Sequence, residues 1–177
     1  MRPVILYITA SLDGYIAEPG GGMGWLGEAS ATESDFGYAE FYASIDTMLM
    51  GSATYEFVLR EAEVFPHADR SVFVFTSRDL PIAAESVALV RTDAAQFVRD
   101  LKARDGGPIW LVGGGKLNSS LLDAGLVDEI QLFVQPVVLG GGVPLFAAPN
   151  DGARLGLETT REWPLGVVEL RYRLGEA

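Results

Sequence analysis

Runs of consecutive apolar residues divide the chain into segments with the pattern of buried strands. These runs cover Val4 to Thr9, Thr47 to Met50, Ser71 to Thr76, Val87 to Val90, Ile109 to Val112, Glu129 to Leu139 and Val167 to Leu174. Several are apolar at nearly every position, which is typical of strands covered on both faces of a sheet. The pattern therefore predicts that these strands lie in the middle of a sheet.

Between these runs, apolar residues recur at the three- and four-residue spacing of a helix. The helical stripes are Tyr38, Phe41, Tyr42 and Ile45, then Phe97, Val98 and Leu101, then Leu117, Leu121 and Leu122. Because strands alternate with helices, we predict an α/β fold with a mostly parallel central sheet and flanking helices. The residues from Arg154 onward indicate a C-terminal antiparallel hairpin at one edge. The length of the chain leads us to expect a single domain over residues 1–177.

The composition excludes several classes of function. The 177 residues are 49% hydrophobic, include no cysteine and carry a formal net charge of −11. A chain without cysteine has neither a disulfide nor a thiolate nucleophile, and its acidity argues against a nucleic-acid partner. No apolar window is long enough for a membrane span, so we expect a cytoplasmic protein without a membrane partner. The single histidine, His67, makes no metal site, and its polar neighbours indicate a surface position.

Three consecutive glycines, Gly113 to Gly115, lie where the run ending at Val112 meets a predicted helix. Glycines at such a junction let a ligand phosphate or ring approach the free N–H groups at a helix N-terminus. The segment is neither a P-loop, which requires Ser or Thr where Leu117 stands, nor a dinucleotide fingerprint, which requires glycine at Asn118. A ligand site is one interpretation of the glycines, and a tight turn without a ligand is the other.

Four segments in one order carry a resemblance to a known family. They are "YITASLDGYIAEPGGGMGWL" from Tyr7, "LMGSATYE" from Leu49, "VFTSR" from Val74, and Ile109 to Phe146. Together they resemble the dihydrofolate-reductase-like superfamily. The branch they resemble most is the C-terminal reductase domain of the bifunctional riboflavin-biosynthesis deaminase-reductase, with its stand-alone bacterial relatives. The resemblance extends over almost the whole chain.

The resemblance implies a fold that binds NADPH and transfers hydride to a small heterocycle. At the nicotinamide end of the cofactor, the resemblance places Ile8 and Thr9 beside the ring and Ile16 and Ala17 beside its ribose. At the adenosine 2′-phosphate it places Thr76, Ser77 and Arg78. Two further groups lie at phosphates, namely Gly51, Ser52, Ala53 and Thr54 at one phosphate, and Val112, Gly113, Gly114, Gly115, Lys116 and Leu117 at the pyrophosphate. The loop Glu18 to Gly24 corresponds to a lid over the nicotinamide. Ser52 departs from the family pattern, because relatives usually carry Arg or Lys there.

Two carboxylates are candidates for catalysis on the substrate side. Asp35 shares a helical face with Tyr38 and Tyr42 and could bind or protonate substrate, although an Asp in the first turn of a helix is also favoured by the helix dipole. Asp13 follows the first strand and could orient substrate or cap a turn. The rings of Trp25, Tyr38 and Tyr42 could stack on a planar substrate or pack in the core.

We therefore expect an NADPH-dependent reductase of a small-molecule substrate such as a pterin, a pyrimidine or a related imine or ketone. The alternatives are a catalytically silent NADP(H)-binding module and a structural subunit without a ligand. We also expect a homodimer, because the run from Val127 to Leu139 is long and apolar enough to need covering at a sheet edge.

Overall fold

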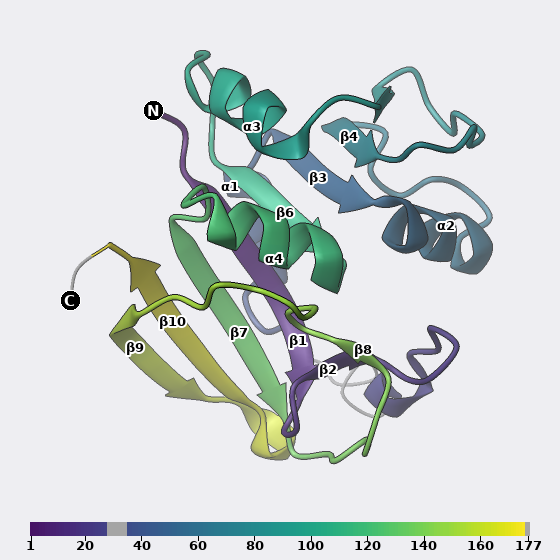
Figure 1. The fold of residues 1–177 in the computed structure, drawn as a ribbon. Helices are drawn as coiled ribbons and strands as arrows, with labels where there is room; N and C mark the ends of the chain where they lie inside the picture. The colour runs from purple at the N-terminus through teal and green to yellow at the C-terminus, as the bar shows by residue number, and fades with distance from the viewer. Residues whose placement is uncertain (28–34, 176–177) are drawn as a thin grey trace.

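The computed structural model describes residues 1–27 and 35–175, and within them one sheet of eight strands runs through the molecule (Figure 1). Its strands are β1 (Val4–Ser11), β3 (Thr47–Gly51), β4 (Ser71–Phe75), β5 (Val87–Val90), β6 (Ile109–Gly113), β7 (Glu129–Gln135), β9 (Leu155–Glu162) and β10 (Val168–Leu174). They lie in the order β5-β4-β3-β6-β1-β7-β10-β9. Neighbours from β5 to β7 pair in parallel, and β10 pairs antiparallel with both β7 and β9. The predicted α/β class, the mostly parallel sheet and the C-terminal hairpin are confirmed.

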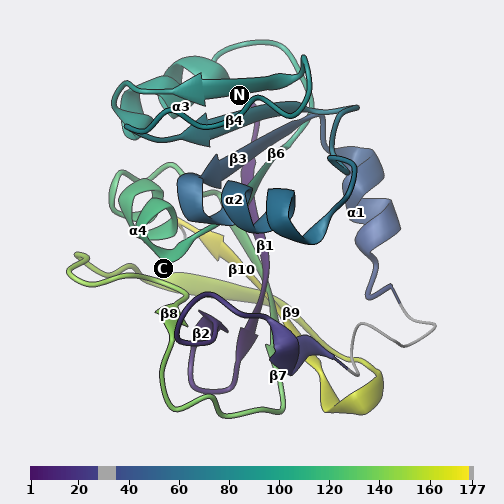
Figure 2. The ribbon, with the colours of Figure 1, turned by 90° about the vertical axis from the view of Figure 1, so that its right-hand side faces the viewer.

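Helices cover both faces of the parallel part of the sheet. They are α1 (Tyr38–Ser44), α2 (Ser52–Glu61), α3 (Ala94–Lys102) and α4 (Gly115–Asp123). Helices α3 and α4 pack with one set of strand side chains, which includes Leu6 and Leu111, while α1 and α2 pack with the set that includes Ile5 and Met48. Figure 2 shows α3 and α4 on one side of the sheet and α1 on the other. Neighbouring residues of β1 thus point into opposite cores, which is why its sequence is apolar without alternation.

None of the helices in the described residues is long and apolar enough to cross a membrane. A second, two-stranded sheet joins β2 (Tyr15–Ala17) to β8 (Val143–Pro144), and the sequence pattern did not predict it. Its strands are too short to show a periodicity of their own.

The longest predicted strand is shorter in the structure, and its position differs from our expectation. Strand β7 ends at Gln135 because Pro136 has no N–H group for the sheet, so residues 136–139 lie outside it. It also lies between β1 and β10 rather than at an edge. The edge argument for a homodimer, based on Val127 to Leu139, is therefore wrong, and the homodimer itself stays a prediction.

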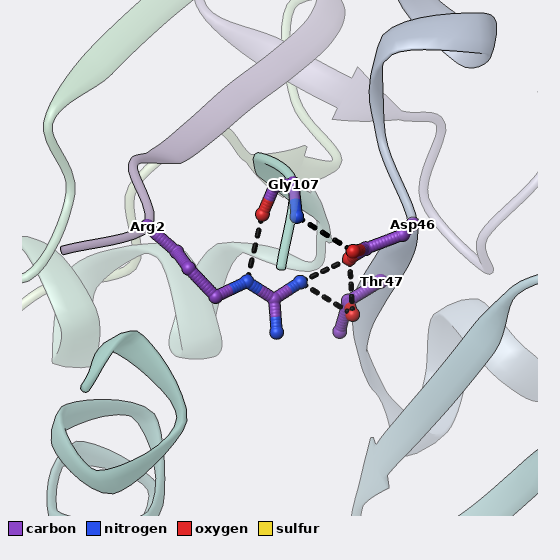
Figure 3. A network of polar contacts seen from close by, with 4 residues as sticks. All are labelled: Arg2, Asp46, Thr47 and Gly107. Atoms are coloured by element: carbon purple, nitrogen blue, oxygen red, sulfur yellow. Dashed lines mark hydrogen bonds and ion pairs between the residues drawn. The ribbon is translucent and has the colours of Figure 1, made fainter. Parts of the chain in front are cut away.

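A buried arginine joins three distant segments at the amino ends of the strands (Figure 3). Arg2 is 7% exposed, and its guanidinium donates to the Gly107 carbonyl at 2.7 Å, donates to the Thr47 hydroxyl at 2.7 Å and pairs with Asp46. The Gly107 N–H in turn donates to the Asp46 carboxylate at 2.6 Å. Burial disfavours the charged carboxylate, but the Gly107 N–H, the Thr47 hydroxyl and Arg2 together lower the pKa of Asp46. The network fixes the N-terminus against the start of β3 and the loop before β6.

We expect Arg2→Leu to lower the free energy of unfolding by about 1–3 kcal/mol, because it leaves buried acceptors without their donor. The loss is measurable by urea denaturation. Since the pKa of Asp46 is lowered on folding, the network stabilises the fold above the unfolded-state pKa, and this stabilisation is lost as the pH falls below about 4. The difference between parent and variant should therefore shrink in acid. Equal stability of the two proteins at neutral pH would contradict this account.

Candidate functional site

A segment between β7 and β9 runs past the carboxyl ends of the strands and forms part of the candidate site (Figure 1). We call residues 136–149 the crossing segment. Its first half is attached to the loop after β1, where the Asp13 carboxylate accepts the N–H groups of Leu139 at 3.0 Å and Gly140 at 2.7 Å. The Leu145 N–H donates to the Gly14 carbonyl at 2.9 Å. The loop after β1 therefore fixes the position of the segment.

The second half of the crossing segment is attached to α4. The fully buried Asn118 donates its side-chain amide to the Leu145 carbonyl, and Ser119 donates its hydroxyl to the Ala147 carbonyl, both at 2.8 Å. The two backbones come so close that a Cβ atom at position 115 would lie 2.2 Å from the Pro144 carbonyl oxygen. Only glycine fits there. Gly115 is thus required by packing within the protein, in addition to any role toward a ligand.

Two adjoining cavities lie beneath the crossing segment. The first, which we call the apolar cavity, has a volume of about 340 Å³. Its lining consists of Tyr7, Ile8, Thr9, Ile16, Ala17, Gly21, Met23, Leu26, Ala53, Thr54, Phe57, Val58, Trp110, Val112, Gly114 and Val143. The second, the glycine-rich cavity, has a volume of about 620 Å³. Its lining consists of Gly51, Ser52, Ala53, Thr54, Phe75, Gly114, Gly115, Lys116, Leu117, Ser120, Gly142, Val143, Pro144 and Ala147.

Most residues that the sequence placed at a cofactor line these cavities. Those in the apolar cavity are Ile8, Thr9, Ile16, Ala17 and Val112; those in the glycine-rich cavity are Gly51, Ser52, Gly115, Lys116 and Leu117; and Ala53, Thr54 and Gly114 line both. Helices α2 and α4 both begin at the glycine-rich cavity, so their free N–H groups and positive dipole ends lie there. This arrangement suits an anionic group such as a phosphate.

Thr76, Ser77 and Arg78, which the resemblance places at the 2′-phosphate, do not line either cavity. Phe75, the residue before them, lines the glycine-rich cavity. The Thr76 hydroxyl accepts the N–H of Arg78 at 2.9 Å. The Arg78 guanidinium donates to both carboxylate oxygens of Glu56 on α2, at 3.0 and 2.6 Å. The hydrogen bond and charge of Glu56 raise the pKa of Arg78. The expected cation for a 2′-phosphate is therefore already paired. Of the other predicted residues, Gly113 also lies outside the lining.

Asp35 lies in the turn before α1, which begins at Tyr38, and outside both cavities, so it does not share a helical face with Tyr38 and Tyr42 as predicted. Its carboxylate accepts the N–H groups of Ala39 at 3.0 Å and Gly37 at 2.9 Å. These bonds, led by the one from Ala39, lower the pKa of Asp35, so the group is ionised at neutral pH and has no proton to donate. The geometry favours the helix-capping alternative over proton transfer to a substrate.

Asp13 also binds groups of the protein itself. In addition to the crossing segment, its carboxylate accepts a hydrogen bond from the Ser11 hydroxyl at 2.7 Å. This bond is the largest of the effects that lower the pKa of Asp13, and the side chain lies outside the lining of the cavities. The geometry favours an anchor for the crossing segment rather than a group that orients substrate.

The aromatic residues predicted to stack on a substrate do not line the apolar cavity. Tyr38 and Tyr42 pack around Trp110, with ring centroids 5.9 and 6.4 Å from it, and Trp110 is the residue that reaches the cavity. Trp25 lies in a short 3-10 turn (Gly24–Leu26), in which Leu26 rather than Trp25 lines the cavity. Tyr38, which is exposed, and Tyr42, which is partly buried, therefore pack against Trp110 from outside the cavity instead of facing a ligand in it.

The predicted surface position of His67 is wrong. Its ring is half-buried, 6.0 Å from the ring of Trp110, and Nδ1 lies 3.4 Å from the Tyr42 hydroxyl. Burial lowers the pKa of His67. The polar neighbours in sequence were misleading because the rings that cover His67 come from other elements. As for metals, the part of the chain that the structure describes has no cluster of three His, Cys, Asp or Glu residues that could hold one.

Sequence reasoning named half of the residues that line the apolar cavity, and two more, Gly21 and Met23, lie in the loop Glu18 to Gly24 that the resemblance places over the nicotinamide. The lining residues that it missed are Tyr7, Leu26, Phe57, Val58, Trp110 and Val143. Tyr7 shares a strand face with the predicted Thr9, since residues two apart in a strand point the same way, so this signal was available. Phe57 and Trp110 become neighbours of the cavity only through the pairing of β3 with β6 and the placement of α2.

Known proteins share this fold and sequence pattern. The chain matches the RibD C-terminal domain family over residues 2–168. The "Uncharacterized protein YwjB" of Bacillus subtilis (strain 168) is 37% identical over 171 residues, which cover 97% of each chain. The structure of the "Putative riboflavin biosynthesis protein" of Shewanella sp. PV-4 matches with a TM-score of 0.87 at 26% identity, over 98% of this chain and 99% of that one. Dihydrofolate reductase from Enterococcus faecalis, solved with NADP(H), matches with a TM-score of 0.72 at 15% identity, over 98% and 97%.

We expect Gly114→Val to abolish nucleotide binding while the protein stays folded. A Cβ atom at Gly114 would meet only the Thr54 hydroxyl, at 3.4 Å, and the backbone there is extended, so the fold accommodates a side chain that fills the shared wall of both cavities. Binding is measured by calorimetric titration with NADPH, and folding by thermal denaturation.

The matched control is Gly115→Ala, whose single methyl group would collide with the Pro144 carbonyl. We expect this smaller change to lower the melting temperature where Gly114→Val does not. Unchanged nucleotide affinity in Gly114→Val would refute the assignment of the glycine-rich cavity.

Proposed function

The chain belongs to the RibD C-terminal domain family, and we propose that it is an NADPH-dependent reductase of a small ring compound. The resemblance to dihydrofolate-reductase-like proteins is confirmed, and this family supports reductase activity. The observation that carries the proposal is the pair of adjoining cavities. The starts of α2 and α4 line the glycine-rich cavity, and apolar side chains line the apolar cavity. The two cavities share the lining residues Ala53, Thr54, Gly114 and Val143.

The residues present fit the two chemically different ends of a nicotinamide nucleotide. The pyrophosphate would be held by N–H groups at the start of α2 and of α4, with the Lys116 ammonium and the Ser120 hydroxyl nearby. These local groups offset the net charge of −11, which by itself repels an anion. The nicotinamide would enter the apolar cavity beside Ile8 and Thr9.

NADPH supplies the hydride when it is bound, and the protein positions the ring and limits the access of water. Apolar atoms surround the space in the apolar cavity where the nicotinamide would lie. They come from β1 and β6, from Met23 before the 3-10 turn and from Leu26 within it. Among the described residues, no acidic side chain lines this cavity, and Asp13 and Asp35 are bound to backbone N–H groups elsewhere. In this proposal water supplies the proton that completes the reduction.

A catalytically silent NADP(H)-binding module is the second candidate, because no acidic side chain among the described residues lines the apolar cavity. Titration with NADPH followed by oxidation kinetics on a panel of pterins, pyrimidinediones and cyclic ketones separates the candidates. Binding with turnover supports the reductase. Binding without turnover on any compound indicates the silent module, and absence of binding leaves a structural role.

We predict that Ser52→Arg widens the preference for NADPH over NADH by about tenfold or more. The two cofactors differ by a phosphate of about −1.5 to −2 charge. A charge-assisted hydrogen bond contributes about 1.5–3 kcal/mol, or roughly 10- to 100-fold in affinity. Ser52 lines the glycine-rich cavity, so an arginine there has access to a bound phosphate. The measurement is the dissociation constant of each cofactor.

The control is Val64→Arg, which adds the same side chain and the same charge at a position that is 80% exposed and lies beyond the other end of α2. We expect it to leave the ratio of the two dissociation constants close to that of the parent. If Ser52→Arg also leaves both constants unchanged, position 52 does not face the 2′-phosphate.

A further inference from the structure

The apolar cavity differs sharply in chemistry from its neighbour. Its far wall, away from the glycine-rich cavity, is made of aromatic and aliphatic side chains, namely Tyr7, Met23, Leu26, Phe57, Val58 and Trp110. None of the lining residues in the described part of the chain is acidic or basic. The glycine-rich cavity, by contrast, contains Lys116 and the hydroxyl groups of Ser52 and Ser120. The two cavities are therefore suited to different parts of a ternary complex.

The polar atoms of the two aromatic walls are already bonded within the protein. The Trp110 indole N–H donates to the Tyr7 carbonyl at 2.9 Å. The Tyr7 hydroxyl donates to the Phe36 carbonyl at 3.3 Å, and burial, followed by the nearby charge of Glu169, raises the pKa of Tyr7, so this hydroxyl is neutral. The side-chain groups that remain for hydrogen bonding to a ligand are the hydroxyls of Thr9 and Thr54. Neutral groups of this kind orient a ligand but do not compensate a charge.

An anionic substrate would also find no basic side chain in the described lining of this cavity. The structure describes residues 1–27 and 35–175, and no Lys, Arg or His among them lines the cavity. The sequences of the remaining segments, EASATES at residues 28–34 and EA at 176–177, contain no basic residue. The net charge of −11 adds a repulsive field. Burial of an unpaired anion is strongly unfavourable, so a phosphate or carboxylate on the substrate would prevent its binding here.

From these observations, and on the basis of the proposed function, we infer that the substrate is an uncharged, planar ring compound with a reducible carbonyl or imine and no phosphate or carboxylate group. Its ring packs between the aromatic and aliphatic walls, and the hydroxyls of Thr9 and Thr54 are the side-chain groups that orient its polar edge. The reduction transfers hydride from NADPH to the carbon of the C=O or C=N bond. Water supplies the proton to the oxygen or nitrogen, which gives the alcohol or amine and NADP⁺.

Isatin and isatin-5-sulfonate provide a matched pair of probes, because they share one ring ketone and differ by a sulfonate charge. Calorimetric titration into NADP⁺-loaded protein measures binding without turnover. We expect isatin to bind about 10- to 100-fold more tightly than its sulfonate. Equal affinities, tighter binding of the sulfonate or binding of neither probe would overturn the inference about the substrate.

A cation added to the wall should weaken this discrimination. In Met23→Lys, an ammonium enters the lining, and we expect the affinity ratio of the two probes to fall by about tenfold. The control is Val64→Lys, at a position 80% exposed and outside the lining, which should keep the ratio of the parent. A fall of equal size in both variants would show a general charge effect and overturn the assignment of the cavity.

Oxidation of NADPH in the presence of isatin tests the proposed function separately. Isatin that binds in preference to its sulfonate, with no reduction of isatin or of any compound of the panel, supports the inference about the cavity and contradicts the reductase. Reduction of both probes with the same efficiency supports the reductase and contradicts the inference.

Discussion

The close approach of the crossing segment to α4 is the constraint on which the candidate site depends. At Gly115 the backbone of the helix meets the carbonyl of Pro144, at a distance that only glycine permits. A second approach of this kind occurs at Gly142, where a Cβ atom would lie 2.0 Å from the carbonyl oxygen of Ala17. Between these two points lies Val143, which lines both cavities. The shape of the site therefore follows from backbone packing at two glycines, with side-chain hydrogen bonds from Asn118 and Asp13 holding the segment in place.

The two ends of the sheet have different roles. At the amino ends, buried charges stabilise the fold: Arg2 pairs with Asp46, and the buried Lys102 pairs with Asp128 and donates to the Leu126 carbonyl. At the carboxyl ends, β1 stops at Ser11, β3 at Gly51 and β6 at Gly113, and the starts of α2 and α4 line a cavity. The charged pairs that stabilise the fold and the candidate site therefore lie at opposite ends of the sheet.

The positive electrostatic character of the glycine-rich cavity comes more from backbone N–H groups than from side chains. The positive groups of the glycine-rich cavity are the N–H groups of α2 and α4 together with Lys116, while Arg78 is neutralised by Glu56. Acidic side chains near the site, Asp13 and Asp35, are engaged by N–H groups of the loops that they organise. Such a site can hold a phosphate by its N–H groups and a neutral ring by its walls, which is the combination that the proposed reductase requires.

The sequence by itself determined the strands of the large sheet, the helices α1, α3 and α4, and about half of the residues that line the two cavities. Apolar runs and glycines at strand ends are local signals, and Gly51 and Gly114 need no distant partner to mark the start of a helix. Only the tertiary structure decided the roles of Asp13 and His67, because their partners are far along the chain: Leu139 is 126 residues from Asp13. The same reason applies to β7, whose apolar pattern is compatible with an edge or a central position until β10 pairs with it. The periodicity of the sequence indicates which faces of the strands and helices are buried. Long-range contacts decide which residues cover those faces and which side chains remain free to contact a ligand.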